Sequence, residues 1–122
     1  METEILEEIK ADVDVQFDTQ EEKQTIVHIS YQRMSRIRVW STTYLKDQNS
    51  NHLSKLIDSY NVGKHPHWKL LRANEEFTLI FEGLPKGCTS FHLVEEIPEP
   101  GGMCYRNISR NNQDVYIIKT QL

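Results

Sequence analysis

Two histidines separated by one proline, His65-Pro66-His67, are the closest approach to a metal-ligand pattern in this chain of 122 residues. Histidines at this spacing can share a metal ion when the backbone is extended. A zinc site needs three or four ligands, so His28, His52 or Cys104 would have to complete the set. The alternative is a solvated loop that Trp68 anchors to the body of the protein. We favour the loop.

Cys88 is the candidate nucleophile, because the nearby cation of Lys86 could lower the pKa of its thiol. A cysteine enzyme also needs an imidazole within hydrogen-bond reach and an oxyanion site. His92 follows four residues later and, at ~3.3 Å per strand residue, is too far along the strand to serve. Gly101-Gly102 follows a Pro-Glu-Pro stretch and opens no helix, so it is not a phosphate loop. We therefore predict no catalytic residue, no metal site, no cofactor and no enzyme activity.

Four large polar or aromatic residues are predicted to share one face of a strand: Arg36, Arg38, Trp40 and Tyr44. Such a face could stack bases and contact phosphates, as single-strand binders do. Arginines beside a tryptophan also form cation–π contacts that merely cover a sheet, and both residue types are common hot spots of protein interfaces. We rank a structural face first, a protein interface second and a nucleic-acid surface third.

The elements that must position these residues are strands, because apolar and polar residues alternate along much of the chain. The alternating segments are 25–31, 36–45, 77–81, 91–93 and 115–118, with Ile37, Val39, Leu45, Phe77, Leu79 and Phe81 among the residues predicted to face inward. Turn-forming residues separate the segments at 47–51, 84–87, 98–102 and 111–114. The pattern is typical of packed antiparallel sheets.

Other segments have a less regular pattern. Residues 1–10 have apolar residues at helical spacing and are compatible with a short helix, and residues 13–17 alternate like a first strand. We expect an edge strand over Leu53–Ile57, followed by an irregular crossover up to residue 72. The prediction is one all-β domain over residues 1–122, an antiparallel β-sandwich of about seven strands.

Composition excludes several classes of protein. Apolar residues make up 38% and charged residues 26% of the chain, which is typical of a globular domain rather than a disordered one. No apolar run has the length of a membrane span, and the first residues are acidic where a signal peptide would carry lysine or arginine. We therefore expect a cytoplasmic protein with no membrane partner, in which Cys88 and Cys104 are reduced thiols.

The net charge of −4 hides an asymmetry. Residues 1–22 form an acidic N-terminal segment with nine acids and one lysine, whereas residues 23–72 hold nine bases and two acids. A basic middle could meet nucleic acid or an acidic partner, or the acidic segment could fold against it and neutralise it. We favour neutralisation, because the whole domain lacks the high isoelectric point of a nucleic-acid binder.

Three segments carry a resemblance to a known kind of domain: Ser41 to Leu45, Phe77 to Gly87, and Phe91 to Glu95. In these segments the chain resembles the immunoglobulin-like domains of uncharacterised Bacteroidetes-type bacterial proteins, over roughly residues 24–119. The resemblance implies an immunoglobulin-like β-sandwich and brings no catalytic residues. Because its first residues are acidic, we expect this chain to differ from the exported members by lacking a signal peptide.

The functional prediction is a non-enzymatic protein-interaction module, acting on a protein partner, by self-association or as an accessory subunit of a larger assembly. Its interface residues would be Arg36, Arg38, Trp40 and Tyr44. Two alternatives stay open. One is a small-ligand or metal-binding enzyme that uses the His65/His67 loop. The other is a single-stranded nucleic-acid binder that uses the face of Arg36, Arg38 and Trp40.

Overall fold

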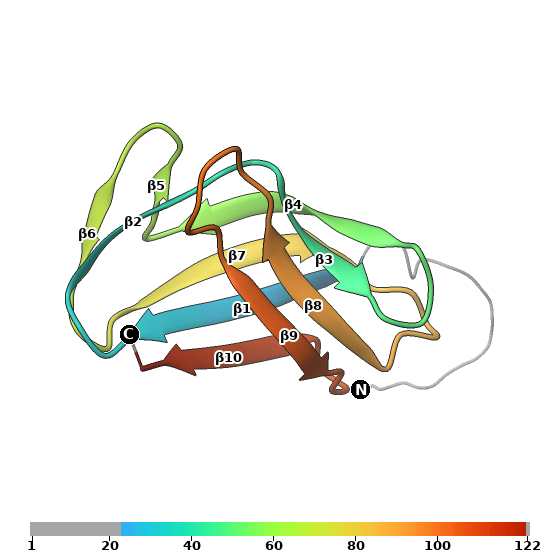
Figure 1. The fold of residues 1–122 in the computed structure, drawn as a ribbon. Helices are drawn as coiled ribbons and strands as arrows, with labels where there is room; N and C mark the ends of the chain where they lie inside the picture. Colours follow the sequence, from blue (N-terminus) through green and yellow to red (C-terminus); the bar gives the residue numbers. More distant parts are fainter. Residues whose placement is uncertain (1–22, 122) are drawn as a thin grey trace.

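The computed structural model describes residues 23–121, and this part of the chain is all-β (Figure 1). The strands are β1 (Gln24–Tyr31), β2 (Ser35–Val39), β3 (Thr43–Asp47), β4 (Leu53–Tyr60), β5 (Gly63–Lys64), β6 (Lys69–Leu71), β7 (Glu76–Glu82), β8 (Ser90–Glu95), β9 (Cys104–Ser109) and β10 (Val115–Thr120). The all-β prediction is confirmed. The helix predicted within 1–10 and the strand predicted over 13–17 lie outside the described residues. Within that range there is no helix that could cross a membrane.

Seven strands form one curled sheet in the order β10-β1-β7-β4-β3-β8-β9, and β5-β2-β6 form a small second sheet. In Figure 1 the strands β3, β8 and β9 cross in front of β10, β1 and β7, and the small sheet lies at one end. The curl occurs at β4. The N-terminal part of β4 pairs with β3, and its C-terminal part pairs with β7 after a register shift between Leu56 and Asp58.

The prediction of purely antiparallel sheets is wrong, because β1 and β10 run parallel, with Ile26 opposite Val115. All other pairs in the large sheet are antiparallel. Alternation of apolar and polar residues reports which face of a strand is buried and contains no information on strand direction. The direction of β10 was therefore not readable from its side chains.

The core lies inside the curl and confirms the predicted inward faces. Phe77, Leu79 and Phe81 of β7 are at most 1% exposed. The other fully buried apolar side chains include Val27, Ile29, Leu45, Leu71, Phe91 and Leu93. The ring of Phe91 on β8 meets Tyr116 on β10 edge to face with centroids 5.0 Å apart, which joins the two layers of the sheet.

The predicted edge strand over Leu53–Ile57 is wrong, because β4 lies in the middle of the large sheet between β3 and β7. Leu53 and Ile57 are 44% and 51% exposed. Their exposure results from their position on the outward face of the sheet, where they alternate with the buried Ser54 and Ser59. Two apolar residues on the outward face therefore suggested an edge that does not exist.

The single strand predicted over 36–45 is two strands in two different sheets. The chain turns after Trp40, and the carbonyl oxygen of Trp40 accepts hydrogen bonds from the backbone N–H of Thr43 at 3.1 Å and from its hydroxyl at 2.7 Å. β2 before this turn belongs to the small sheet, and β3 after it belongs to the large one. The inward orientation predicted for Ile37, Val39 and Leu45 is nevertheless confirmed.

The segment predicted as an irregular crossover contains the other two strands of the small sheet. β5 pairs with β2 in parallel, with Gly63 opposite Arg38, and β6 pairs with β2 in antiparallel fashion, with Leu70 opposite Arg36. A Cβ on Gly63 would lie 2.2 Å from the carbonyl oxygen of His67, so only glycine fits this turn. The loop between β5 and β6 contains a cis peptide bond between His65 and Pro66.

Candidate functional site

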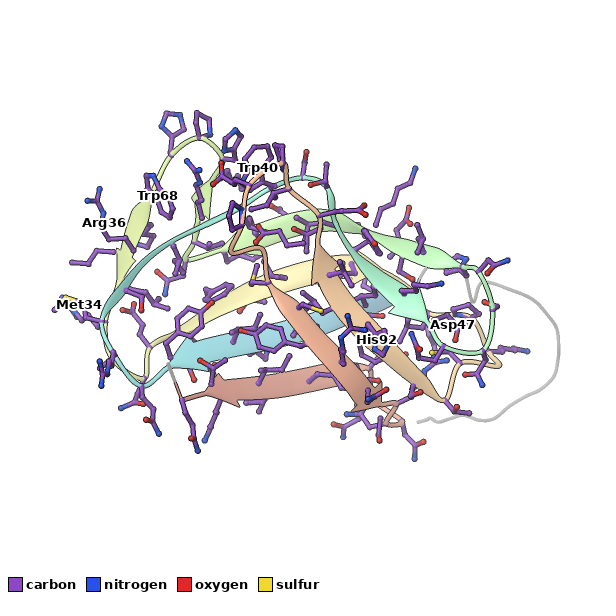
Figure 2. All side chains as sticks on the ribbon, in the orientation of Figure 1. Met34, Arg36, Trp40, Asp47, Trp68 and His92 are labelled. Carbon is purple, nitrogen blue, oxygen red and sulfur yellow. The ribbon has the colours of Figure 1, made fainter. Side chains whose placement is uncertain are left out.

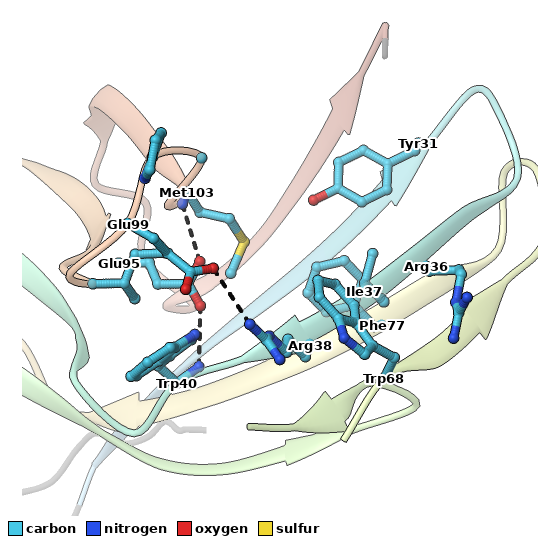
Figure 3. Close-up of a pocket in the computed structure, with 13 residues that line it drawn as sticks. Tyr31, Arg36, Ile37, Arg38, Trp40, Trp68, Phe77, Glu95, Glu99 and Met103 are labelled. Carbon is cyan, nitrogen blue, oxygen red and sulfur yellow. Dashed lines mark hydrogen bonds and ion pairs between the residues drawn. The ribbon is translucent and has the colours of Figure 1, made fainter. Parts of the chain in front are cut away.

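A cleft of about 350 Å³ opens between β2 and the loop that joins β8 to β9 (Figure 3). Arg36, Arg38, Trp40 and Trp68 form one wall, and Glu99, Pro100 and Gly101 of the loop form the other. Ile37 and Phe77 of the core and the ring of Tyr31 also line it. The cleft therefore has a largely apolar base and polar or aromatic walls, which is the general composition of ligand sites.

Arg38 is the central side chain of the cleft, and the structure holds it on several sides. Its guanidinium lies 4.1 Å from the ring centroid of Trp68 and 5.9 Å from that of Trp40. It donates to the carbonyl oxygen of Pro66 at 3.2 Å and pairs with the Glu99 carboxylate at 3.3 Å. The side chain is only 14% exposed. Arg38 thus links β2 to the β5–β6 loop and to the β8–β9 loop.

The aromatic rings continue this arrangement into a stack. The imidazole of His65 lies on Trp40 with centroids 3.5 Å apart and ring planes 17° from parallel. The order is His65, Trp40, Arg38 and Trp68, so Trp40 has His65 stacked against it and Arg38 nearby. Trp68 is 51% exposed. Of the two tryptophans in the stack, Trp68 is the more exposed and offers more of its surface to a ligand.

Glu95, at the end of β8, fixes the base of the cleft. Its carboxylate is 8% exposed and accepts hydrogen bonds from the backbone N–H of Trp40 at 3.0 Å and of Met103 at 3.1 Å. These bonds join the end of β2 to the β8–β9 loop (Figure 3). A buried carboxylate whose oxygens accept backbone hydrogen bonds in this way is a structural group, and it positions both walls of the cleft.

A second hollow of about 420 Å³ adjoins the cleft and shares Tyr31, Arg36 and Met103 with it. Burial, the largest cause, raises the pKa of Tyr31 and of Tyr105, and the negative charge of Glu95 raises it further in both. Both phenols are therefore protonated at neutral pH.

The structure brings together three of the four predicted interface residues. Arg36, Arg38 and Trp40 all line the cleft. Tyr44 does not, because it lies on β3 in the large sheet, opposite Val94. Burial, followed by the charges of Glu96 and Cys104, raises the pKa of Tyr44. Tyr44 is separated from the other three by the chain turn after Trp40.

Sequence reasoning missed Trp68, Leu70 and Met34, which the structure adds to the same region. Figure 2 shows Trp68 and Met34 near Arg36. Leu70 lies opposite Arg36 in the β2–β6 pair, and Met34 directly precedes β2. They are 56% and 62% exposed. Alternation over residues 68–72 was a usable signal for Trp68 and Leu70, but it covers too few residues to stand out beside the histidines.

The histidines of the predicted metal loop have other surroundings. His65 stacks on Trp40, and no three histidine, cysteine, aspartate or glutamate side chains gather in a metal-binding arrangement within residues 23–121. Trp68 packs on Arg38 of β2 and is 51% exposed, so it holds the loop against the small sheet and stays outside the core. His28 bonds the Thr78 hydroxyl at 2.8 Å.

Cys88 lies in a setting that disfavours a thiolate. The side chain is buried, its thiol lies 3.4 Å from the Ser90 carbonyl oxygen, and the Asp47 carboxylate is its other neighbour. Burial, with the hydrogen bond and negative charge of Asp47, raises the pKa of Cys88 to about 11. The neutral thiol that results is a poor nucleophile. Both Cys88 and Cys104 are free.

Comparison of the chain with protein-family models, with curated proteins and with solved structures gives no match.

Proposed function

We propose that this chain is a protein-binding module whose contact surface is the small sheet and the adjoining cleft. The observation that carries the proposal is the half-exposed Trp68 held against Arg38 beside the stacked Trp40. Trp and Arg dominate the hot spots of protein interfaces, particularly where their rotamers are held before the partner arrives. Arg38 and Trp40 are held in this way by their contacts within the protein.

Binding explains the cleft better than catalysis does. The acidic groups of the cleft, Glu95 and Glu99, are occupied by backbone N–H groups and by Arg38. The phenols of Tyr31 and Tyr105 are held protonated by burial and by neighbouring charge. A general base needs an accessible acceptor near the reacting proton, and these groups do not supply one.

The remaining parts of the proposal concern the kind of domain and its setting. The all-β fold and the resemblance of three segments support an immunoglobulin-like sandwich that presents its binding surface at one end. The composition supports a cytoplasmic setting. Self-association and a place as an accessory subunit of a larger assembly are both compatible with a single exposed contact surface.

Selection from a random peptide library tests the proposal. Peptides enriched on the wild-type protein are measured again on Trp68→Ala and on Arg106→Glu, which changes an exposed residue of β9. We expect the selected peptides to lose most of their affinity for Trp68→Ala and to retain it for Arg106→Glu. Sedimentation of the same three proteins tests self-association through this surface.

Two results would contradict the proposal. One is a selection that enriches no peptide over the background of the library, together with a monomer at every concentration. The other is a set of peptides that bind Trp68→Ala as well as wild type, which would place the contact surface elsewhere in the molecule. A normal circular dichroism spectrum of Trp68→Ala establishes that lost binding reflects a lost contact.

A further inference from the structure

On the outward face of the small sheet, arginines of β2 lie beside large apolar residues of the neighbouring β6 and of the position just before it. Along β2, Met34 precedes Arg36 and Arg38, and along β6, Trp68 precedes Leu70. Across the strands, Arg36 lies opposite Leu70 and Arg38 lies against Trp68. The three apolar side chains are more than half exposed. Figure 2 shows Met34, Arg36 and Trp68 at the same end of the molecule.

The segments that form the small sheet contain more bases than acids. Residues 33–39 and 63–72 contain the six bases Arg33, Arg36, Arg38, Lys64, Lys69 and Arg72 and no acid. Within the described residues, two of the six form ion pairs, Arg38 with Glu99 and Lys64 with Asp58. Glu75 lies close enough to Arg72 and Lys69 for their charges to lower its pKa. Arg36 forms no ion pair with residues 23–121, and its charge would favour a ligand that brings carboxylates or phosphates.

β6 also provides an edge. The small sheet has the order β5-β2-β6, so one side of β6 pairs with β2 and the other side pairs with no strand among residues 23–121. An extended peptide can add to such an edge through backbone hydrogen bonds, and its side chains then meet the side chains of the sheet at a spacing of two residues. A face that carries bases on one strand and apolar side chains on the next suits a peptide that brings both carboxylates and apolar side chains.

We propose that the partner of this module is an acidic, extended segment of another protein, with apolar side chains placed among its carboxylates. The proposal rests on the proposed function and names the chemistry of the partner. The carboxylates would meet Arg36 and the neighbouring bases, and the apolar side chains would pack on Trp68, Leu70 and Met34. Charge complementarity and the free edge of β6 both favour this occupant.

Single-stranded nucleic acid is the other polyanion that a basic aromatic face can attract, but the rings do not suit it. Single-strand binders stack successive bases on several open rings. Here Trp40 lies between His65 and Arg38, so of the two tryptophans only Trp68 offers an open indole face. The exposed Met34 and Leu70 offer apolar contacts, which a partner protein can use better than a phosphate backbone.

The test measures fluorescence anisotropy with four defined probes. They are a short labelled peptide in which glutamate alternates with leucine and serine, the same peptide with glutamine for glutamate, the same peptide with lysine for glutamate, and an oligothymidylate of equal length. We expect the glutamate peptide to bind about tenfold more tightly than the glutamine peptide. Its affinity should fall as salt screens the charges.

The variants locate the contact. Arg36→Glu should weaken binding of the glutamate peptide by about tenfold, and Leu70→Ser should weaken the glutamate and glutamine peptides alike. Arg106→Glu is the matched control, because it reverses an exposed arginine on β9 outside the small sheet, and it should leave binding unchanged. Circular dichroism of each variant confirms that the fold is retained.

Several outcomes overturn the proposal. If the glutamine peptide binds as tightly as the glutamate peptide and both depend on Trp68, the acidic partner is refuted while the protein-binding function stands. If oligothymidylate binds more tightly than every peptide, the partner is a nucleic acid and both proposals fail. Failure of every probe to bind refutes the acidic partner, and equal losses for Arg36→Glu and Arg106→Glu refute the location.

Discussion

Two arginines on the same strand should respond differently to the same charge reversal. Arg38 is 14% exposed and is held by Trp68, Pro66 and Glu99, whereas the side chain of Arg36 is exposed and lies opposite Leu70. We expect Arg38→Glu to destabilise the folded protein and Arg36→Glu to leave its stability nearly unchanged. The difference in stability between these two variants tests whether the contacts of Arg38 in the cleft are formed in the protein without a partner.

The magnitude follows from the contacts that Arg38→Glu removes. The stacking of the guanidinium on Trp68 at 4.1 Å contributes about 1 kcal/mol. The charge-assisted hydrogen bond to the Pro66 carbonyl contributes about 1.5 kcal/mol. The ion pair with Glu99, which is half exposed, adds at most about 0.5 kcal/mol because water screens it. The expected loss is about 3 kcal/mol, compared with about 0.5 kcal/mol or less for Arg36→Glu.

Urea unfolding measures both quantities. The protein has two tryptophans, Trp40 and Trp68, and both line the cleft, so their fluorescence reports this region while circular dichroism reports the sheets. Arg38→Lys keeps the positive charge but loses the planar stacking and the forked donors, so it should lose about half as much stability as Arg38→Glu. Equal and small losses for Arg38→Glu and Arg36→Glu would refute the reasoning, since Arg38 would then be a free surface side chain.

Two further predictions concern the core and the effect of acid. Leu79→Ala should cost about 2–5 kcal/mol of the free energy of unfolding, because Leu79 is fully buried on a strand paired on both sides and its cavity cannot collapse easily. Ile57→Ala, at a half-exposed side chain, is the control, and a similar loss for both in urea would show that the inward face of β7 is misassigned. Asp47→Asn should lower the free energy of unfolding by about 1.5–3 kcal/mol at neutral pH. Burial alone would raise the pKa of Asp47, but hydrogen bonds from Ser50, Asn49 and Cys88 outweigh burial and hold this pKa below its usual value. A carboxyl whose pKa is lower in the folded state stabilises the protein above the unfolded pKa of about 4. The difference in free energy of unfolding between wild type and Asp47→Asn, measured in urea, should therefore disappear as the pH falls through the folded pKa. A difference that does not depend on pH would contradict this.

The buried faces were readable from the sequence because alternation has a direct physical cause. Successive side chains of a strand point to opposite faces, so Phe77, Leu79 and Phe81 had to share the buried side of one strand. The same rule placed Ile37 and Val39 inside and Arg36 and Arg38 outside, which is the basis of the candidate site. Connectors rich in proline, glycine and asparagine were equally visible.

Strand partners were not readable, because pairing depends on tertiary contacts that alternation does not encode. The chain turns between Trp40 and Thr43 without glycine or proline, so one long strand was expected and Tyr44 was assigned to the wrong sheet. Trp68 was expected to anchor its loop to the body of the protein, but its contact residue was not readable. It stacks on Arg38, which is about 30 positions away in the sequence, a contact that only the fold creates.

The parallel pairing of β1 with β10 has a consequence for how the chain reaches its native state. β1 is the first strand of the described region and β10 the last, so one side of β1 stays uncovered until the ribosome has released the residues around Val115 to Thr120. Contacts between such distant segments form slowly, because the entropy of closing the long loop must be overcome first. During this interval the bare edge of β1, with Val27 and Ile29 at its centre, is open to pairing with other nascent chains. The yield of folded protein should therefore depend on how quickly β10 follows β9 out of the ribosome.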